Sequence, residues 1–464
     1  MFRSIKRYLK TRRQLVKFDE DFYLRQYTDV ADAVLRGQYQ SGLEHYKRHG
    51  HREGRQIFEG STISLRHGAA FEQTEFATLR AIDRRMRPLR YHITPSRPAV
   101  ANIFIPTLDK DVFFGGYIAF LNFLMRISLR GMKLRFILLE ETSFKPADFD
   151  TFRADKLWQG AFDDAEFVNA SKRDVFLSLN PSDVFISYST WTTLDAAPLA
   201  ERLKKKVIFF IQEYEPSFHC YDSFHFMSNS AYSVPHVAIF NSRALKDYFE
   251  VNRIGVFARP DPQFVTFEHA ILSPPPPSGR KRTIPALLFY ARPEAHALRN
   301  LFSVGVLALR TCAGRGIITP RWQLTGIGST TYYKLEIGRG IYLNGLPKLA
   351  PDEYRRKVQD YTVGLSLMAT PHPGVVHFEW AAAGLATVVN TTPERAPAFF
   401  HARSPNLVPA QPTVAGIADA IEQAAKRTGG LEPPSAAISG YPTSWNQAFD
   451  AAFMDQAMKL IARC

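Results

Sequence analysis

The sequence predicts an α/β protein with two parallel, doubly wound sheets that face each other across a cleft, preceded by a small α-helical module. Two observations predict this fold class. From residue 98 onward, short apolar runs alternate with helical patterns, which is typical of parallel sheets covered by helices. A proline-rich segment, residues 273–282 (SPPPPSGRKR), interrupts this alternation, and a second series of the same kind follows it. Such a segment is typical of a semi-rigid linker, so we predict one α/β domain on each side of it.

The composition indicates a globular protein with an anionic partner. The 464 residues suffice for two or three domains with their own cores. With 58 Lys and Arg against 44 Asp and Glu, the formal charge is +14, which favours nucleic acid, a phosphate-bearing substrate or a membrane surface as partner. Cys220, Cys312 and Cys464 lack the spacing of a metal site or a disulfide framework, which fits a reducing cytosol. No apolar run is long enough to span a bilayer and no signal-peptide pattern is present, so we expect a cytoplasmic protein.

Two segments precede the α/β series. Residues 1–17 are strongly basic with interspersed apolar side chains. As a helix they could rest on anionic lipid, and a disordered basic tail is an equally good interpretation. Residues 18–60 repeat aromatic and aliphatic side chains every three or four positions, which predicts short amphipathic helices. They resemble a small helical module of bacterial surface-associated and glycan-synthesis proteins, and we interpret them as a docking or spacer element without catalytic residues.

The first α/β domain is predicted over residues 98–272. Helical patterns over 117–129 and 198–204 lie between its apolar runs, which we expect to be strands. The expected strands are 100–105, 134–139, 184–187, 207–211 and 237–240. After the first of them, Gly115 and Gly116 open a helix, and glycines at such a place let the backbone approach a ligand closely.

The second α/β domain is predicted over residues 283–440. Its expected strands are 286–290, 321–325, 341–343, 363–368, 386–389 and 406–408. The tail, residues 441–464, contains a helical run from Trp445 that we expect to cross back to the first domain. Doubly wound sheets bind ligands at the carboxyl ends of their strands, so the residues that follow these strands are the candidates for the site.

Two arginines follow the first strand of the second domain. Arg292 comes at the strand end, and Arg299 lies within the helix that follows. Two guanidinium groups near one strand end could grip a diphosphate by charge-assisted, bidentate hydrogen bonds, and the alternative is a pair of surface arginines. The next strand ends near Gly326, in another loop that permits close contact with a ligand.

The stretch Thr370–Gly384 forms a strand end, a tight turn and a helix. The turn contains His372 and Gly374, and the helix is expected to begin near Val375. Unpaired N–H groups at a helix start suit phosphate. Glu379, inside that helix, is a candidate to accept hydrogen bonds from ribose hydroxyls. The alternative is an ordinary helix with one exposed glutamate.

These residues together resemble a known family. The sequence over roughly residues 98–455 is similar to GT-B glycosyltransferases of the glycosyltransferase family 4 type, and more closely to rhamnosyltransferases of bacterial surface-glycan synthesis. The most specific pieces are IQEYEPSF (residues 211–218), FYARPEAHALRNLF (289–302) and GLSLMATPHPGVVHFEWAAAGLATVV (364–389). The resemblance implies the GT-B fold, two Rossmann-like domains of which the second binds the nucleotide sugar.

The resemblance also implies roles for the site candidates. Arg292 matches the family's diphosphate ligand, and Arg299 matches a later basic ligand less closely. His372, Gly374 and Val375 match the loop that meets phosphate or sugar, and Glu379 matches the ribose ligand. Gly115 and Gly116 match the glycine loop that faces the phosphates. Pro371 stands where the family's E-x7-E motif has its first glutamate, as in the rhamnosyltransferase-like subset.

The segment after the strand at 207–211 supplies the catalytic candidates, Glu213 and Glu215. One of them could deprotonate an acceptor hydroxyl if the reaction inverts the anomeric carbon. Retention requires no dedicated base in this family. We favour Glu215, and a structural acid that holds the loop is an equally good interpretation. His219, Asp222 and His225 follow closely and are candidates for contact with the acceptor.

The sequence predicts no metal site and no cofactor. Asp19–Asp21 and Asp109–Asp111 have the Asp-x-Asp spacing of metal-dependent transferases, but we interpret both as fortuitous because arginines and helix N-termini can neutralise the leaving group.

The predicted function is metal-independent transfer of rhamnose or another deoxyhexose from a nucleotide-diphosphate donor, for example dTDP-rhamnose. The acceptor is a growing, lipid-linked surface glycan, and the predicted location is the cytoplasm, at the cytoplasmic face of the inner membrane. A nucleotide-sugar epimerase is the first alternative. A nucleic-acid-binding protein is the second, but most aromatic residues lie in apolar patterns, so we expect no nucleic acid.

Overall fold

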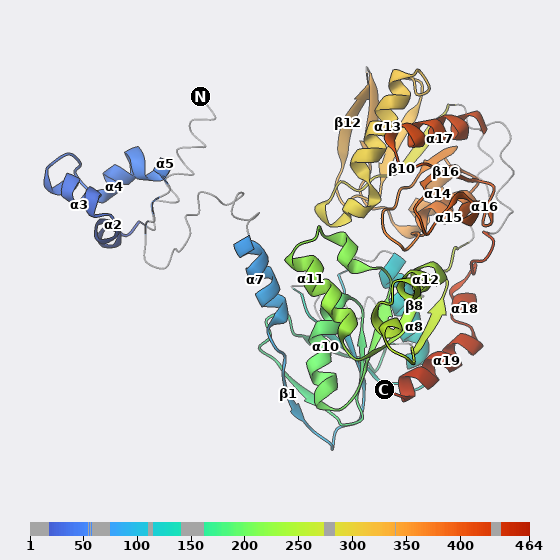
Figure 1. The fold of residues 1–464 in the computed structure, drawn as a ribbon, viewed down its shortest axis with the longest axis horizontal. Coiled ribbons are helices and arrows are strands. Elements are labelled where there is room, and N and C mark those ends of the chain that lie inside the picture. Colours follow the sequence, from blue (N-terminus) through green and yellow to red (C-terminus); the bar gives the residue numbers. More distant parts are fainter. Residues whose placement is uncertain are drawn as a thin grey trace. The chain divides into compact units, whose positions relative to one another are not determined.

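The computed structural model describes residues 18–53, 55, 57, 75–109, 115–140, 162–272, 284–338, 340–427 and 438–464 (Figure 1). The chain divides into two compact units, Met1–Arg84 and Arg85–Cys464. The predicted basic segment 1–17 and the predicted linker 273–282 lie outside the described residues.

The first unit contains the small helical module. Its helices are α2 (Glu20–Gln26), α3 (Thr28–Leu35), α4 (Gly42–His45), the π-helix η1 (Tyr46–Gly50) and α5 (His51–Glu53). Tyr23, Val30 and Tyr46 form its core, as expected from the period of the apolar residues. The side chain of Asp19 accepts a hydrogen bond from the backbone of Phe22, 2.9 Å, and so caps the N-terminus of α2. Asp19 of the first Asp-x-Asp pair therefore has a structural role.

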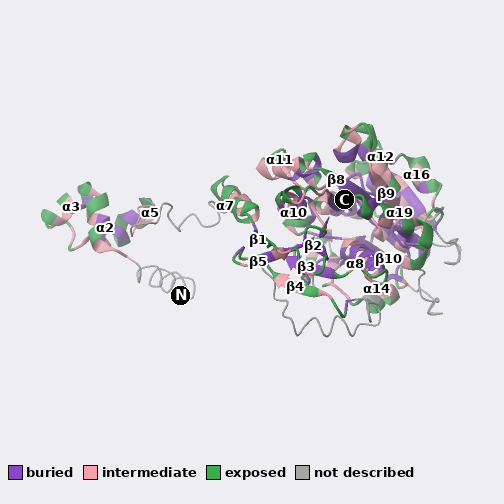
Figure 2. Cartoon of the chain, turned by 90° about the horizontal axis from the view of Figure 1, so that it is seen from below, coloured by how far each residue is buried: buried purple, intermediate pink, exposed green. Residues whose placement is uncertain are grey.

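The second unit begins with the end of α7 (Glu75–Met86), and its described residues form three sheets. The first large sheet has the order β4-β3-β2-β6-β7-β8-β9, and every neighbouring pair is parallel. Its strands are β2 (Ala101–Ile105), β3 (Leu134–Leu138), β4 (Glu166–Asn169), β6 (Val184–Ser187), β7 (Val207–Ile211), β8 (His236–Asn241) and β9 (Phe264–Phe267). The helices α8 (Gly115–Ser128), α10 (Thr190–Arg202), α11 (Ser223–Ser230) and α12 (Arg243–Val251) connect them. The central strands are fully buried (Figure 2), which explains their unbroken apolar runs.

The second large sheet has the order β12-β13-β11-β10-β14-β15-β16. Its strands are β10 (Ala286–Tyr290), β11 (Gln323–Ile327), β12 (Tyr333–Gly338), β13 (Ile341–Gly345), β14 (Val363–Leu365), β15 (Ala386–Asn390) and β16 (Leu407–Ala410). Its helices are α13 (Phe302–Gly314), α14 (Pro351–Val358), α15 (Val376–Ala382), α16 (Pro397–His401) and α17 (Val414–Lys426). All pairs are parallel except β12 with β13, which form an antiparallel edge. The two doubly wound sheets confirm the predicted fold class, the GT-B arrangement of two Rossmann-like domains.

Among the described strands, five have no counterpart among the predicted ones: β4, β9, β12, β1 (Arg90–Ile93) and β5 (Phe176–Leu179). They lie at sheet edges or, for β1 and β5, together in a two-stranded sheet. Their side chains alternate between buried and exposed or stay partly exposed, so they lack the continuous apolar runs that mark the central strands.

The C-terminal helices α18 (Trp445–Ala448) and α19 (Ala451–Ala462) pack on the first α/β domain, beside α8 and β9 (Figure 1). Phe449 lies between Phe123 of α8 and Phe267 of β9, with ring centroids at 5.9 and 4.7 Å. Burial of such aromatic rings contributes on the order of 2 kcal/mol each. Within the described residues, no helix has the length and apolar character that would let it cross a membrane.

Both large sheets have a switch point, where the order of the strands reverses. In the first domain this point lies between β2 and β6, and in the second between β10 and β14. The loops at the carboxyl ends of those strands diverge there and leave room for a ligand. The first domain thus presents the region of Gly116 and Tyr188, and the second domain presents Arg292 and the turn at 370–374.

Candidate active site

Arg292 is a buried cation at the switch point of the second domain. It comes two residues after β10 and is 4% exposed. Its Nη2 lies 2.9 Å from His296 Nε2, and its Nε lies 3.8 Å from the carboxylate of Glu294. Partial burial, then the charge of Arg292, lower the pKa of His296, so the neutral ring accepts the hydrogen bond. The guanidinium is therefore oriented on two sides, which prepares it to bind an anion.

Arg299 contacts both α/β domains. It belongs to the 3-10 helix η7 (Ala295–Asn300), which Leu301 separates from α13 with a left-handed φ of 52°. The guanidinium lies 4.5 Å from the ring centroid of Phe218, which comes from the first domain, in a cation–π contact. Its Nη1 donates to the carbonyl of His296, 3.0 Å. The predicted helix is therefore a short 3-10 turn rather than an α-helix.

Gly326 and Gly328 have different neighbours. A Cβ at Gly326 would meet the hydroxyl of Tyr333 and the side chain of Ala291, so this glycine makes room for packing inside the sheet. Gly328 has a φ of 100°, and a Cβ there would lie 3.2 Å from Arg292. Gly326 is the glycine predicted for the site, but Gly328 is the one that lies against Tyr290 and Arg292. The two glycines thus differ in their neighbours and in backbone conformation, neither of which the sequence shows.

The turn at 370–374 is held from several sides. The backbone N–H of Gly374, whose φ is 82°, donates to His372 Nδ1 at 3.0 Å. A side chain at that φ would be strained, so glycine is required there. Arg395 donates to the carbonyl oxygens of Met368, Thr370 and His372 at 2.8–2.9 Å. Arg395 is 1% exposed, and no motif in the sequence points to it.

Glu379 lies in α15, whose N-cap is Val375. Its Oε2 accepts a hydrogen bond from Tyr354 Oη, 2.9 Å, and the same hydroxyl accepts one from Trp380 Nε1, 3.0 Å. Burial raises the pKa of Glu379. The carboxylate is therefore half-buried and oriented by Tyr354, which differs from the freely exposed glutamate of the alternative interpretation.

Glu213 and Glu215 follow β7 but face different groups. Glu215 Oε2 accepts hydrogen bonds from Thr190 N, 3.1 Å, and Thr190 Oγ1, 2.7 Å, at the N-terminus of α10. Burial, against these hydrogen bonds, raises the pKa of Glu215 to about 7. Glu213 Oε2 accepts from Thr370 Oγ1, 2.7 Å, and Oε1 from His372 N, 3.2 Å. Glu213 thus binds the turn of the opposite domain, whereas Glu215 stays within its own.

The glycine loop of the first domain is described from Gly115 onward. The carbonyl of Gly115 lies 3.2 Å from His269 Nε2. A Cβ at Gly116 would lie 3.2 Å from the hydroxyl of Tyr188 and 3.3 Å from the side-chain amide of Gln212. These polar groups border the switch point, and neither Tyr188 nor Gln212 was identified from the sequence.

The acceptor candidates lie together on a separate surface of the first domain. His219 stacks on Phe224 with centroids 5.1 Å apart, and Asp222 caps α11 by accepting from His225 N, 2.8 Å. The ring of His225 contacts that of Tyr221, which is 97% exposed. Asp222 therefore has a structural role, whereas the exposed aromatic surface beside it is open to a ligand.

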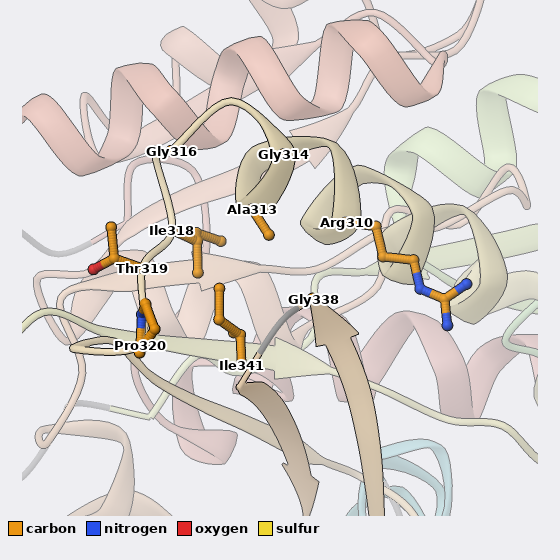
Figure 3. A pocket seen from close by; sticks show the side chains of 9 residues that line it. All are labelled: Arg310, Ala313, Gly314, Gly316, Ile318, Thr319, Pro320, Gly338 and Ile341. Carbon is orange, nitrogen blue, oxygen red and sulfur yellow. The ribbon is translucent and has the colours of Figure 1, made fainter.

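A hollow of about 430 Å³ lies elsewhere in the second domain (Figure 3). Figure 3 shows Ala313, Ile318 and Ile341 pointing toward one another, with Arg310 at the rim. The hollow is next to the C-terminus of α13 and the loop that leads into β11, so it adjoins the amino end of that strand. None of the predicted site residues lines it.

In the described part of the chain, no three His, Cys, Asp or Glu side chains gather closely enough to hold a metal ion. Asp109 accepts a hydrogen bond from Thr107 Oγ1, 2.8 Å, and Asp111 lies outside the described residues. Metal independence stays a prediction.

The structure thus brings several of the candidates to one place. Glu213 contacts His372 directly. Burial raises the pKa of Glu213 and Glu215 and lowers that of His372. The positive charge of Arg299 is a smaller effect that acts to lower all three pKa values. Arg292 joins this group through His296, which contacts both arginines. Gly326 and the acceptor candidates lie outside it, and the assigned roles of all these residues stay predictions.

Comparison with known proteins identifies relatives for this arrangement. Two models of one family, described as the N-terminal and the C-terminal domain of WsaF, match residues 100–243 and 285–422 in that order. Together they cover more than half of the chain. The O-antigen biosynthesis protein RfbC of Myxococcus xanthus is 24% identical over 304 residues, which are 64% of this chain and 22% of that protein. The chain therefore spans about a fifth of the length of that relative.

Solved structures share the arrangement of the domains. Anabaena Alr3699/HepE in complex with UDP and glucose is 12% identical with a TM-score of 0.52, and covers 79% of this chain and 100% of its own. The same protein in complex with UDP is 11% identical with the same TM-score and coverage. At such identity the likeness shows the fold alone.

Proposed function

Since the chain belongs to the WsaF family and has the GT-B fold, we propose that it is a glycosyltransferase, which transfers rhamnose or another deoxyhexose from a nucleoside-diphosphate donor to a growing surface glycan. The observation that carries the proposal is the buried guanidinium of Arg292 at the switch point, oriented by Glu294 and His296. A guanidinium oriented in this way at the switch point is suited to bind an anion such as a diphosphate by charge-assisted hydrogen bonds. The relation to an O-antigen biosynthesis protein supports a surface glycan as product.

In the proposed reaction the diphosphate leaves with its charge neutralised by protein groups. Arg292 and Arg299 bind its oxygens, next to the N-terminus of α15. Cationic and N–H groups that are already oriented stabilise developing negative charge without reorganisation, so the proposed mechanism needs no metal ion and no other cofactor.

Glu215 is the proposed base for the acceptor hydroxyl. Oε2 is held by Thr190, and Oε1 has no hydrogen bond to the described residues. A carboxyl group with a pKa of about 7 is well matched to proton transfer near neutral pH. The acceptor glycan would approach over His219, Asp222 and His225, beside the exposed ring of Tyr221.

The proposed acceptor is lipid-linked, and the protein would work at the cytoplasmic face of the inner membrane. The basic residues of segment 1–17 support this part, because each Lys or Arg near an anionic lipid surface contributes about 1 kcal/mol of attraction. The positive charge of the chain also favours binding of the nucleotide sugar, which is an anion.

A binding screen tests the nucleotide-sugar site. We expect one of dTDP-rhamnose, UDP-glucose or GDP-mannose to raise the melting temperature in the presence of EDTA. Replacement of Glu379 by Ala should weaken that binding about 10- to 100-fold, because a hydrogen bond to a charged group contributes about 1.5–3 kcal/mol. Titration calorimetry measures the dissociation constants, and Glu353→Ala, an exposed glutamate of α14, is the matched control.

Two results would contradict this proposal. If no nucleotide or nucleotide sugar binds with or without Mg²⁺, the site is not a nucleotide-sugar site. If Glu379→Ala binds as tightly as the wild type, Glu379 is not a ligand of the ribose.

A further inference from the structure

Glu213 is anchored in one domain and bound to the other. It follows β7 of the first domain and is 9% exposed. Its two oxygens accept hydrogen bonds from Thr370 Oγ1 and from the backbone N–H of His372, both in the second domain. Oε1 also accepts from the backbone of Tyr214, 3.2 Å. A carboxylate with this many donors is strongly oriented, because hydrogen bonds to charged groups are the strong ones.

Arg395 holds the same turn from the opposite side. Glu213 binds an N–H and a hydroxyl of the turn, whereas Arg395 binds its carbonyl oxygens. Both side chains are buried and carry opposite charge, and the charge of Glu213 raises the pKa of Arg395 against the larger effect of burial. The backbone of His372 is thus fixed through its N–H by one domain and through its C=O by the other.

The ring of His372 has one defined tautomer. Nδ1 accepts the hydrogen bond of Gly374 N–H, so it carries no proton. Burial, then the charges of His269, Arg395 and Arg299, lower the pKa of His372 to about 3, so the ring is neutral. The single proton therefore lies on Nε2. That atom is buried, and within the described residues it has no hydrogen-bond partner.

A buried N–H donor without a partner costs about 1–3 kcal/mol, so a structure that retains one is expected to satisfy it with a ligand. The ligand must offer an acceptor oxygen. It must lie between the two domains, because the turn that bears His372 is bound to both of them.

We propose that Glu213 is a positioning residue that fixes the 370–374 turn so that His372 Nε2–H donates to an oxygen of the nucleotide sugar. This inference rests on the proposed function. Arg395 holds the carbonyl oxygens of the turn from within the second domain, whereas its N–H and hydroxyl groups are held by Glu213 only while the two domains are joined. Binding of the nucleotide sugar and closure of the domains are thereby coupled, and Glu213 moves no proton in the reaction.

The hydrogen bonds of Glu213 to Thr370 and His372 are tested first, in the absence of ligand. Hydrogen exchange followed by mass spectrometry reads the backbone N–H of His372, and ¹⁵N NMR of labelled histidine reads its tautomer. We expect Glu213→Ala to increase exchange at residues 370–374 at least tenfold. Glu201→Gln, an exposed glutamate of α10, should leave the exchange unchanged. Unchanged exchange in Glu213→Ala, or a proton on Nδ1 in the wild type, would overturn the inference.

The coupling is tested next with the nucleotide sugar found in the screen. We expect Glu213→Gln to weaken its binding about tenfold or more, but to have little further effect in a His372→Ala background. Thr370→Val removes only the hydroxyl donor and serves as the second variant if Glu213→Gln fails to fold. Additive losses, or a Thr370→Val protein that binds like the wild type, would show that Glu213 does not act through His372.

The pH profile separates positioning from proton transfer. A positioning role predicts that Glu213→Gln lowers the rate but keeps the acid limb of the profile, and that added formate does not restore the rate. If Glu213→Gln loses the acid limb of the pH profile, or if formate restores its rate, Glu213 is the base instead. Failure of the proposed function is distinguishable, because it would abolish nucleotide binding in the wild type while the exchange result stands.

Discussion

Replacement of Arg292 by alanine is expected to lower kcat/KM for the nucleotide sugar about 100- to 1000-fold. The guanidinium is buried at the switch point and is the best-oriented cation near the proposed diphosphate. Loss of one oriented group that stabilises developing charge typically costs this much. Initial rates of nucleoside diphosphate release measure the effect.

Two variants make this test specific. Arg292→Lys keeps the charge but loses the bidentate geometry, so we expect an intermediate loss. Arg310→Ala changes an exposed arginine of the same domain, at the rim of the hollow, and should leave the rate within twofold. An Arg292→Ala enzyme within threefold of the wild type would show that the diphosphate is neutralised by other groups.

Replacement of Glu215 by glutamine is expected to lower kcat about 100- to 10,000-fold and to remove the acid limb of the pH profile. The amide oxygen can still accept both hydrogen bonds from Thr190, so the structure at the N-terminus of α10 is kept. The lost group is the base, which in the wild type becomes active as the pH rises through about 7. A variant with a normal rate and an unchanged limb would leave Glu215 only a structural role.

The raised pKa of Glu215 also makes the free energy of unfolding depend on pH. Burial raises the pKa of Glu215 from 4.5 to about 7 in the folded protein, so the folded state binds the proton more tightly than the unfolded state. The free energy of unfolding should therefore fall as the pH rises from about 4.5 to 7, by at most about 3 kcal/mol. Glu215→Gln should lack this contribution and be more stable than the wild type at pH 8. Urea unfolding at pH 5 and pH 8 measures the difference.

The fold class could be predicted because the central strands of both sheets are buried on both faces. Strands such as β7 and β10 are unbroken apolar runs between helical patterns, and they appear in the structure within a residue or two of the predicted bounds. The edge strand β12 could not be predicted in this way, since it has partly exposed side chains and pairs antiparallel. The bend after η7 depends on the left-handed conformation of Leu301, which no local sequence pattern predicts.

Some residues of the candidate site could likewise be predicted from the sequence, and others could not. Arg292, His372 and Glu379 could be named because each follows a strand end or lies in the first turn of the helix after it, which are local features. Arg395 could not be named because it lies in an irregular loop after β15 and reaches the turn only through the tertiary fold. Nor could the sequence tell that Glu213 faces the second domain while Glu215 faces α10, because the two differ only in side-chain direction after β7.

The most direct test of the central claim is an assay of sugar transfer with purified protein in the presence of EDTA. It follows dTDP-rhamnose, or the donor that the binding screen identifies, by mass spectrometry with and without a lipid-linked glycan acceptor. We predict release of the nucleoside diphosphate together with an acceptor extended by one sugar, and only when the acceptor is present. Conversion of the nucleotide sugar to an isomer without acceptor would contradict transfer and favour an epimerase. Activity that requires an added divalent ion would contradict the metal-independent mechanism.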